Sequence, residues 1–465
     1  MVWPPAETDG RNPRDNGHVL FKQFVDDDLG CASYLVGDEQ AGEAFVVDPA
    51  YAIEQYLAEA ERKHVRICGV LESHTHADHV SGHGRLALEH EVSVAVHPAA
   101  DPTFPFQPLT DGEQMEAGEV SIRVIHTPGH RPEHCCFAVV DRTRADEPWL
   151  VLTGDSLLVG DAARPDLAIE AREGAEDLFH SLHRLLELPD GVEIYPGHVA
   201  GSLCGAAMNS KASSTIGFER RFNHALAVTD IAAFIAEAAA ASATPRPPNM
   251  ERIVELNRGP FVAGQPPLAR LSSPNGATVL DVRSPKEFAA GHAPGAINVT
   301  IGGSGFPTRA AFVLDGNDGV VLHASSEAEA QRAARGLYAV GLFGVDGYVP
   351  DVDAYEQVEP VTLDELEQLL SNGGVELVDV REKDERDQGY IPESLHIPYR
   401  RMRACADELR GKSTVVTICE GGSRASTAAS ILAAAGIDAR PVLGEGVSAW
   451  KARGRQCVEF RRCGS

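Results

Sequence analysis

The sequence predicts an α/β protein built from several domains. Its 465 residues suggest about three domains at the usual 100–200 residues per domain. A repeat is visible in the second half, where VLDVRSPKEFAAGHAPGAINV from residue 279 returns as LVDVREKDERDQGYIPESLHIP from residue 377. Each copy opens with an apolar strand that ends in Asp-Val-Arg, and a later strand runs directly into an Ala-rich helix. We therefore expect two copies of one α/β module behind a larger first domain.

A Pro-rich stretch at about 243–276 separates the first domain from the repeat. It interrupts the alternation of strands and helices and is typical of a linker that wraps a domain edge. We expect a first domain over 1–258, a second over 262–356 and a third over 357–465.

Composition and charge limit the possible partners of the chain. Asp and Glu number 68 against 41 Lys and Arg, and the formal charge of −27 disfavours binding to nucleic acid or anionic membranes. No apolar run approaches the roughly 20 residues of a membrane span, and the N-terminal residues lack the apolar core of a secretory signal. Nine cysteines without CxxC spacing fit a reducing compartment. A cytoplasmic enzyme is the expectation.

The first half carries a concentration of histidine and aspartate. The segment SHTHADHVSG is followed downstream by TPGH, TGDSLL and YPGH. Together these segments supply seven candidate ligands: His74, His76, Asp78, His79, His130, Asp155 and His198. Any one of them alone would be an ordinary surface histidine or capping aspartate. As a set they can converge without severe repulsion only around a cation, so the pattern predicts a metal site.

This order of motifs, HxHxDH and then a later His, Asp and His, resembles the metallo-β-lactamase superfamily. The resemblance spans roughly the first half of the chain. It implies an N-terminal αββα sandwich with the ligands on loops at strand ends. Because this fold hosts hydrolases, oxidoreductases and dioxygenases, it does not settle the reaction.

The second repeat contains a candidate nucleophile in TVVTICEGGSRASTAASIL. Cys419 ends a strand, and the loop residues Gly421, Gly422 and Ser423 lead to Arg424 at the start of a helix. With DVR upstream and GVSAWKARG downstream, this Cys-x-x-Gly-x-Arg pattern resembles rhodanese sulfurtransferases. Inward-facing N–H groups and the nearby guanidinium would stabilise a thiolate or persulfide. Four residues separate Cys and Arg, whereas related cell-cycle phosphatases have five. The shorter loop forms a smaller anion-binding cradle, which suits a sulfur atom better than a phosphate. The alternative is a buried structural cysteine.

The first repeat lacks this machinery. A gapless alignment of the two copies puts Ala324 at the position of Cys419 and Glu329 at that of Arg424. A glutamate would repel a persulfide, so we expect a degenerate rhodanese-like domain kept for packing or docking. His323 is more often a structural histidine than a substitute nucleophile.

The three parts together resemble bacterial persulfide dioxygenase–sulfurtransferase fusions over essentially the whole chain. That resemblance implies one Fe(II) held by His74, His130 and Asp155, a 2-His-1-carboxylate set with open positions for a persulfide and O2. Within TGDSLLVGDAARPDL it places Arg164 near the metal as a substrate-binding residue, although a salt bridge to Asp166 is nearly as good an explanation.

The activity implied by this resemblance has two parts. A low-molecular-weight persulfide of glutathione, coenzyme A or another thiol would be oxidised by O2 to sulfite, and Cys419 would transfer sulfane sulfur to sulfite to give thiosulfate. A homo-oligomer is implied only by resemblance.

Two alternatives stay open. His76, Asp78, His79 and His198 supply what a second metal would need, and a dizinc site would then hydrolyse a thioester, as in glyoxalase II. In the other alternative the metal site is vestigial, and the chain is a sulfur carrier or docking scaffold. Cys419 is then the only functional residue.

Overall fold

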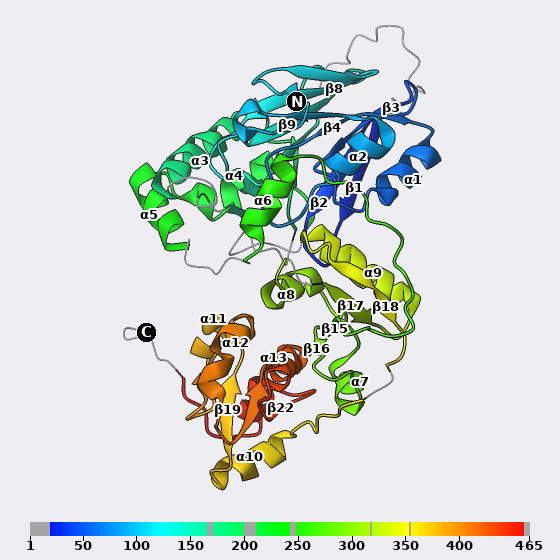
Figure 1. Cartoon of the computed structure of the whole chain (residues 1–465). Coiled ribbons are helices and arrows are strands. Elements are labelled where there is room, and N and C mark those ends of the chain that lie inside the picture. The colour runs from blue at the N-terminus through cyan, green and yellow to red at the C-terminus, as the bar shows by residue number, and fades with distance from the viewer. Residues whose placement is uncertain are drawn as a thin grey trace. The chain divides into compact units, whose positions relative to one another are not determined.

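The structure is a computed structural model, and it describes residues 19–163, 165, 171–199, 211–241, 248–316, 319–352 and 355–459. The chain divides into two compact units (Figure 1). The first comprises Met1–Pro245 with Ile253–Gly264, and the second comprises Arg246–Arg252 with Gln265–Ser465. The three predicted domain boundaries stay predictions.

Two six-stranded sheets form the first unit. The first sheet has the order β1 (Val19–Val25), β2 (Ala32–Asp38), β3 (Glu43–Val47), β4 (Arg66–Leu71), β5 (Ser93–Val96), β6 (Gln107–Pro108). The second has the order β14 (Ser214–Thr215), β13 (Glu193–Pro196), β10 (Leu150–Gly154), β9 (Cys135–Asp141), β8 (Val120–His126), β7 (Gln114–Ala117). A short ribbon, β11 (Leu157–Leu158) with β12 (Asp161–Ala162), follows β10.

Strand alternation divides the apolar side chains between three layers. On β2, Tyr34 and Val36 face the core between the two sheets, whereas Leu35 faces the helices. On β9, Phe137 lies in the inter-sheet core and Ala138 lies in the core on the opposite face. Both faces are therefore buried, because successive side chains of a strand point to opposite sides.

Helices cover the outer faces of both sheets (Figure 1). The helices of the first unit are α1 (Glu54–Lys63), α2 (His83–His90), α3 (Ala171–Leu185), α4 (Ile216–Phe222), α5 (Ile231–Ala241). Tyr56 of α1 and Leu86 of α2 enter the core behind the first sheet, and Leu178 of α3 and Phe234 of α5 enter the core behind the second. The αββα sandwich expected for the first half is confirmed.

The stretch predicted as a linker contains a helix, α6 (Met250–Arg258). Its sequence MERIVELNR is amphipathic, and Ile253 and Asn257 are buried on one face at i,i+4 spacing. The prolines that suggested an irregular linker flank this helix, and the apolar side chain of Ile253 gives it a buried face. The segment therefore reaches the metal-binding region of the first unit as a structured element.

The second unit repeats one sheet topology. Its first sheet has the order β16 (Ile297–Asn298), β15 (Thr278–Asp281), β17 (Val320–His323), β18 (Val345–Val349), and its second has the order β20 (Leu395–His396), β19 (Val375–Asp379), β21 (Thr414–Ile418), β22 (Ala439–Pro441). All neighbouring strands in both sheets are parallel. The helices are α7 (Pro285–Ala290), α8 (Phe306–Val313), α9 (Glu327–Ala339), α10 (Leu363–Ser371), α11 (Lys383–Asp387), α12 (Met402–Cys405), α13 (Ser423–Ala434), α14 (Val447–Ala452). The predicted repeat is confirmed.

The Asp-Val-Arg motif has the same structural role in both copies. Arg283 pairs with Asp281 through two nitrogens and donates to the carbonyl of Gly291 at 2.7 Å. Arg381 pairs with Asp379 in the same way and donates to the carbonyl of Gly389, also at 2.7 Å. Since both copies keep this arrangement, the motif braces the strand end in each, and in the second copy Arg381 Nη1 also pairs with Glu420 at 2.7 Å.

Among the described residues, no helix combines the length and the apolar character needed to cross a membrane.

Candidate metal centre and candidate sulfur-transfer loop

Three predicted ligands meet at one end of the sandwich. His74 follows β4, His130 follows β8 and Asp155 follows β10, and all three side chains are buried. Asp155 Oδ2 lies 3.6 Å from His130 Nε2 and 3.9 Å from His74 Nε2. One donor atom from each residue lies within 4.8 Å of the other two. The three side chains therefore offer two imidazoles and one carboxylate to a single point.

The protonation states of these residues suit a cation. Burial and the neighbouring His76 and His130 hold the pKa of His74 well below its ordinary value, so its ring is neutral. Burial alone would raise the pKa of Asp155, but His198 and His130 more than offset it and keep the carboxylate ionised. A neutral imidazole and an ionised carboxylate are the forms in which these groups bind metal.

Asp155 is held by its backbone as well. Its N–H donates to His134 Nε2 at 2.9 Å, and burial lowers the pKa of His134 to about 3, so this ring stays neutral and can accept. Gly154 precedes it with φ +47°, and a Cβ there would lie 2.6 Å from His134 Nε2. Only glycine fits at this position between β10 and Asp155. The backbone conformation there fixes the direction in which the side chain of Asp155 points.

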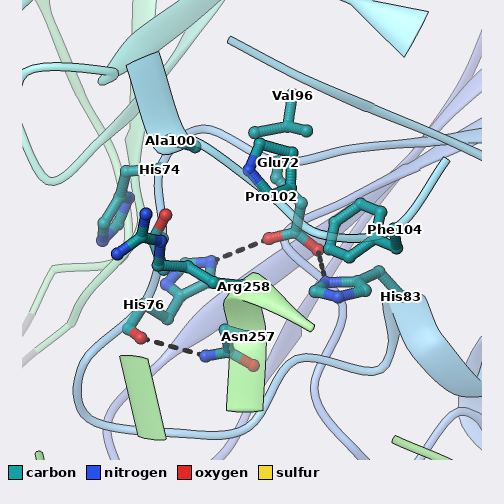
Figure 2. A pocket seen from close by; sticks show the side chains of 11 residues that line it. Glu72, His74, His76, His83, Val96, Ala100, Pro102, Phe104, Asn257 and Arg258 are labelled. Atoms are coloured by element: carbon teal, nitrogen blue, oxygen red, sulfur yellow. Dashed lines mark hydrogen bonds and ion pairs between the residues drawn. The ribbon is translucent and has the colours of Figure 1, made fainter. Parts of the chain in front are cut away.

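His76 does not join the three ligands. Figure 2 shows its ring directed toward Glu72, and its Nε2 lies 3.2 Å from Glu72 Oε2 and 3.3 Å from Asp48 Oδ1. Burial would lower the pKa of His76, but Asp48 and Glu72 raise it well above its ordinary value. Burial would raise the pKa of Glu72, yet His76 and His83 lower it to about 2. His76 is thus a buried cation between two carboxylates.

Asp78, His79 and His198 gather around Cys31, a residue that the sequence analysis did not single out. Cys31 Sγ lies 3.1 Å from Asp78 Oδ2, 3.6 Å from His79 Nδ1 and 3.4 Å from His198 Nε2. His198 Nε2 lies 2.8 Å from Asp78 Oδ2, and its Nδ1 lies 2.7 Å from Asp155 Oδ1. Burial and Asp78 raise the pKa of the Cys31 thiol. This second group touches the first through Asp155.

Asn257 on α6 holds the HTHADH loop in place. Its carboxamide donates to the carbonyls of His76 at 2.9 Å and His79 at 2.8 Å, and its Oδ1 accepts from the N–H of Ser81 at 2.8 Å. Figure 2 shows the first of these bonds. Three backbone groups of a ligand-bearing loop are satisfied by one buried side chain, so Asn257 orients the loop without touching the ligand cluster.

The residues fit a metal ion. The buried Nε2 of His79, in the same HTHADH loop, has no protein hydrogen-bond partner. Buried polar atoms left this way are costly unless another group satisfies them. The donors are imidazole and carboxylate, which suit iron and zinc alike. His74, His130 and Asp155 would hold the ion, whereas Arg164 and Asp166 lie outside the described residues.

The candidate nucleophile lies at a strand-loop-helix joint in the second unit. Cys419 directly follows β21 and is 2% exposed. The N–H of Gly422 donates to its Sγ at 3.1 Å, and Gly422 has φ +97°. The loop residues Gly421, Gly422 and Ser423 therefore curve back over the sulfur, and α13 begins at Ser423. A donor aimed at the sulfur favours an anion there.

Arg424 faces a carboxylate. Its Nη1 and Nη2 lie 2.5 and 2.7 Å from the two oxygens of Glu385 on α11, a bidentate pair. Burial would raise the pKa of Glu385, but Arg424 lowers it. The positive charge expected at the cradle is present and is shared with a residue that the motif did not point to.

The first copy has no such cradle. Ala324 is fully buried after β17, and the Glu329 carboxylate accepts from the N–H of Ser325 at 2.9 Å, where it caps the start of α9. His323 Nδ1 lies 3.1 Å from Asp281 Oδ2 in a buried pair, which is the structural placement that we expected. The residues at the two motif positions therefore serve the fold.

Sequence reasoning missed residues that support the two candidate sites. At the metal centre these are Cys31, Asp48, Glu72 and Asn257. At the sulfur-transfer loop it missed Glu385, which pairs with Arg424. Glu72 offered a signal, since it directly precedes the SHTHADH run at the end of an apolar strand. The others are single residues far along the chain from the groups that they contact.

Comparisons with protein families match both halves of the chain. Residues 26–198 match the metallo-beta-lactamase superfamily, and residues 267–352 and 362–453 each match the rhodanese-like domain. A solved structure of a metallo-beta-lactamase from Staphylococcus aureus superposes with a TM-score of 0.67 at 29% identity, covering 72% of this chain and all of that one.

Curated relatives match the first half. Persulfide dioxygenase ETHE1 of Bos taurus is 29% identical over 188 residues, which are 39% of this chain and 68% of that protein. The probable polyketide biosynthesis zinc-dependent hydrolase BaeB of Bacillus velezensis is 28% identical over 192 residues, 40% of this chain and 80% of that protein. A hydroxyacylglutathione hydrolase of Pseudoalteromonas translucida is 31% identical over 183 residues, 38% of this chain and 63% of that protein.

Proposed function

Because the first half of the chain belongs to the metallo-beta-lactamase superfamily and the second half holds two rhodanese-like domains, we propose that the protein is a persulfide dioxygenase joined to a sulfurtransferase. The observation that carries the proposal is the grouping of His74, His130 and Asp155 apart from His76. Three protein donors leave open positions on an ion that prefers six, as a mononuclear Fe(II) does in dioxygenases of this ligand type.

The residues of the metal centre supply ligand atoms in fixed positions. His74 supplies a neutral ring, His130 supplies a second imidazole, and Asp155 supplies one oxygen while its other oxygen is bound by His198. When bound, Fe(II) would bring a persulfide sulfur and O2 together. The overall change takes one persulfide, one O2 and one water to one thiol, one sulfite and two protons.

Cys419 performs the second reaction. Its thiolate attacks the outer sulfur of a persulfide, the sulfur–sulfur bond breaks, and the parent thiol leaves with a proton while Cys419 becomes a persulfide. Sulfite then attacks the outer sulfur of that persulfide, which releases thiosulfate and the thiolate. The N–H of Gly422 and the guanidinium of Arg424 stabilise the negative charge in both steps.

A dizinc thioester hydrolase is the second candidate function. Two relatives named as hydrolases, BaeB and the hydroxyacylglutathione hydrolase, favour it. The position of His76 between Asp48 and Glu72 speaks against it, because a two-metal site would need a ligand from His76. Thioester hydrolysis also yields no sulfur that Cys419 could transfer.

O2 uptake by the Fe(II)-loaded protein on addition of glutathione persulfide tests the proposal. We expect uptake with sulfite in the Cys419→Ser variant, and thiosulfate in addition in the parent protein. Cys457→Ser, a partly buried cysteine of the same domain, is the matched control and should behave as the parent. No uptake at full iron occupancy, with thioester hydrolysis in the zinc form, would replace the dioxygenase by the hydrolase. Coenzyme A persulfide in a parallel assay addresses the identity of the thiol.

A further inference from the structure

We propose that Arg258, the last residue of α6, is a substrate-binding residue that selects persulfides whose carrier thiol bears a carboxylate. The inference rests on the proposed persulfide dioxygenase and names the substrate class of that same site. It arises from a pocket in the first unit that is lined by both His74 and Arg258 (Figure 2). His74 is one of the three residues that would hold the iron. A molecule in this pocket can therefore contact both a residue of the metal centre and a guanidinium.

The pocket has the character of a site for a small organic molecule. One wall is apolar and consists of Val96 at the end of β5 with Ala100, Pro102 and Phe104 after it. The enclosed space is about 280 Å³, including the part open to solvent. Pockets for small molecules span about 300–1,000 Å³ and use a few polar groups to orient the ligand. The space therefore fits a small thiol or one arm of glutathione, and the nucleotide of coenzyme A would lie outside it.

Arg258 is the charged group of the pocket that has donors left for a ligand. Glu72 is already paired with two histidines, and the carboxamide of Asn257 is used by three backbone groups. Arg258 Nη2 donates to Asp101 Oδ2 at 2.5 Å and to the Asp101 carbonyl at 3.2 Å, but its buried Nε has no protein hydrogen-bond partner. A guanidinium carries five N–H donors in a fixed fork that matches a carboxylate.

The existing partner of Arg258 can be displaced. The side chains of Arg258 and Asp101 are 40% and 86% exposed, and ion pairs this exposed contribute little to stability. A substrate carboxylate that enters the pocket can therefore take over the guanidinium. The formal charge of −27 on the whole chain repels anions at long range, so capture of an anionic thiol depends on a local cation of this kind.

The backbone holds the end of α6 at the pocket independently of the arginine side chain. The N–H and the hydroxyl of Thr103 both donate to the carbonyl of Arg258, at 2.7 and 3.2 Å. Beyond the helix, the ring of Phe261 stacks on Phe104 with the centroids 4.4 Å apart. Replacement of the Arg258 side chain should therefore leave the pocket walls in place.

Anaerobic titration calorimetry of the full-length, Fe(II)-loaded protein tests the assignment. The probes are glutathione and its dimethyl ester, which lacks both carboxylates. We expect Arg258→Gln to bind glutathione about 5–20-fold more weakly than the parent and to bind the ester as the parent does. Arg220→Gln is the matched control, because Arg220 is 41% exposed and also pairs with an aspartate of the first unit. Equal affinity of the parent for both probes, or an equal loss of both in Arg258→Gln, overturns the proposal.

Asp101→Asn distinguishes ligand binding from a structural role of the ion pair. Asparagine tolerates the φ of +51° at this position but removes the charge that competes for Arg258. Glutathione binding should therefore tighten by about 2–5-fold, since the exposed pair no longer has to be broken. Weaker binding of both probes would instead mean that the pair only supports the loop, and the proposal would be wrong.

Steady-state kinetics connects the assignment to the reaction. KM for glutathione persulfide should rise in Arg258→Gln with little change in kcat, the pattern of a group that binds substrate and transition state equally. The calorimetric measurement does not depend on O2 uptake. No uptake in the parent, with carboxylate-dependent binding intact, would refute the dioxygenase and keep the role of Arg258. Normal uptake without any preference for the carboxylate would do the reverse.

Discussion

Asp155 divides its two carboxylate oxygens between different neighbours, and His198 takes one of them. Oδ1 accepts from His198 Nδ1 at 2.7 Å, while Oδ2 faces the ring of His130 at 3.6 Å. His198 therefore fixes the rotation of the carboxylate about its own bond. This relationship makes His198 a positioning residue for the candidate metal centre, whatever else it binds.

Replacement of His198 by alanine should weaken iron binding without removing a ligand of the first centre. We expect a loss of roughly 10–100-fold in Fe(II) affinity, the usual cost of deleting a group that orients a ligand. Anaerobic competition with a chelator, in the absence of zinc, measures it. His183→Ala on the exposed face of α3 is the control. Equal affinities in His198→Ala and parent would mean that Asp155 is held by its backbone alone.

His76→Gln should keep one iron ion per chain, whereas His74→Gln and His130→Gln should lose it. The glutamine can still donate to Asp48 or Glu72, so we expect only a loss of about 1–3 kcal/mol in the free energy of unfolding. Iron content and thermal unfolding of the same samples measure both effects. Loss of iron in His76→Gln would place His76 among the ligands and revive the dinuclear alternative.

The difference between the predicted and the observed site has a physical origin. His74, His130 and Asp155 lie in short motifs of distinctive residue types, so their convergence could be inferred from the sequence. Asn257 contacts the same loop from 181 positions away, and nothing in the local pattern MERIVELNR marks its carboxamide. Cys31 has no distinctive neighbours in the sequence, and it meets His198 only through the bridge between these two residues, which lie just before β2 and just after β13. Periodicity predicts which face of an element is buried, but not which long-range partner meets it.

Acid should destabilise the metal-free protein through Glu72. Because His76 and His83 lower the pKa of Glu72 from 4.5 to about 2, its charged form stabilises the fold above pH 4.5, and this contribution is lost as the pH falls toward 2. The loss is on the order of 3 kcal/mol. Chemical unfolding at pH 5 and pH 3 captures about 2 kcal/mol of this loss, since pH 3 still lies above the pKa of Glu72 in the folded protein. Glu72→Gln should show a smaller difference between the two pH values. An unchanged pH dependence in Glu72→Gln would assign the acid sensitivity to other carboxylates.

Glu385→Gln should strengthen the binding of small anions at the sulfur-transfer loop. Glu385 shares the guanidinium of Arg424 and competes with sulfite or thiosulfate for it. Since the pair is partly exposed, we expect KM for thiosulfate to fall by about 3–10-fold with little change in kcat, which corresponds to roughly 1 kcal/mol. Glu376→Gln, which pairs with Lys412 instead, is the control. A higher KM would show that Glu385 orients Arg424 for the anion.

The degenerate copy supports the helix that carries the active loop, and Asn298 makes the connection. Its Oδ1 accepts from Ser426 Oγ on α13 at 2.7 Å, its N–H donates to Ser430 Oγ at 2.9 Å, and its Nδ2 donates to the carbonyls of Asp281 and Arg283. Every polar atom of this buried carboxamide is used. A domain that has lost its nucleophile thus contributes a fixed surface against which α13, and with it Arg424, is held.

Asn298 lies outside the loop, but its replacement by alanine should therefore lower sulfurtransferase activity. The alanine leaves Ser426 Oγ and two backbone carbonyls without this partner, so we expect a loss of about 1–3 kcal/mol in the free energy of unfolding. Activity should fall at temperatures where the protein is still folded, because Arg424 loses its support. Asn372→Ala at the exposed end of α10 is the control. The double variant Asn298→Ala with Ser426→Ala should cost less than the sum of the two single changes, since each removes the same hydrogen bond. Strict additivity would mean that the two copies do not support each other through this contact.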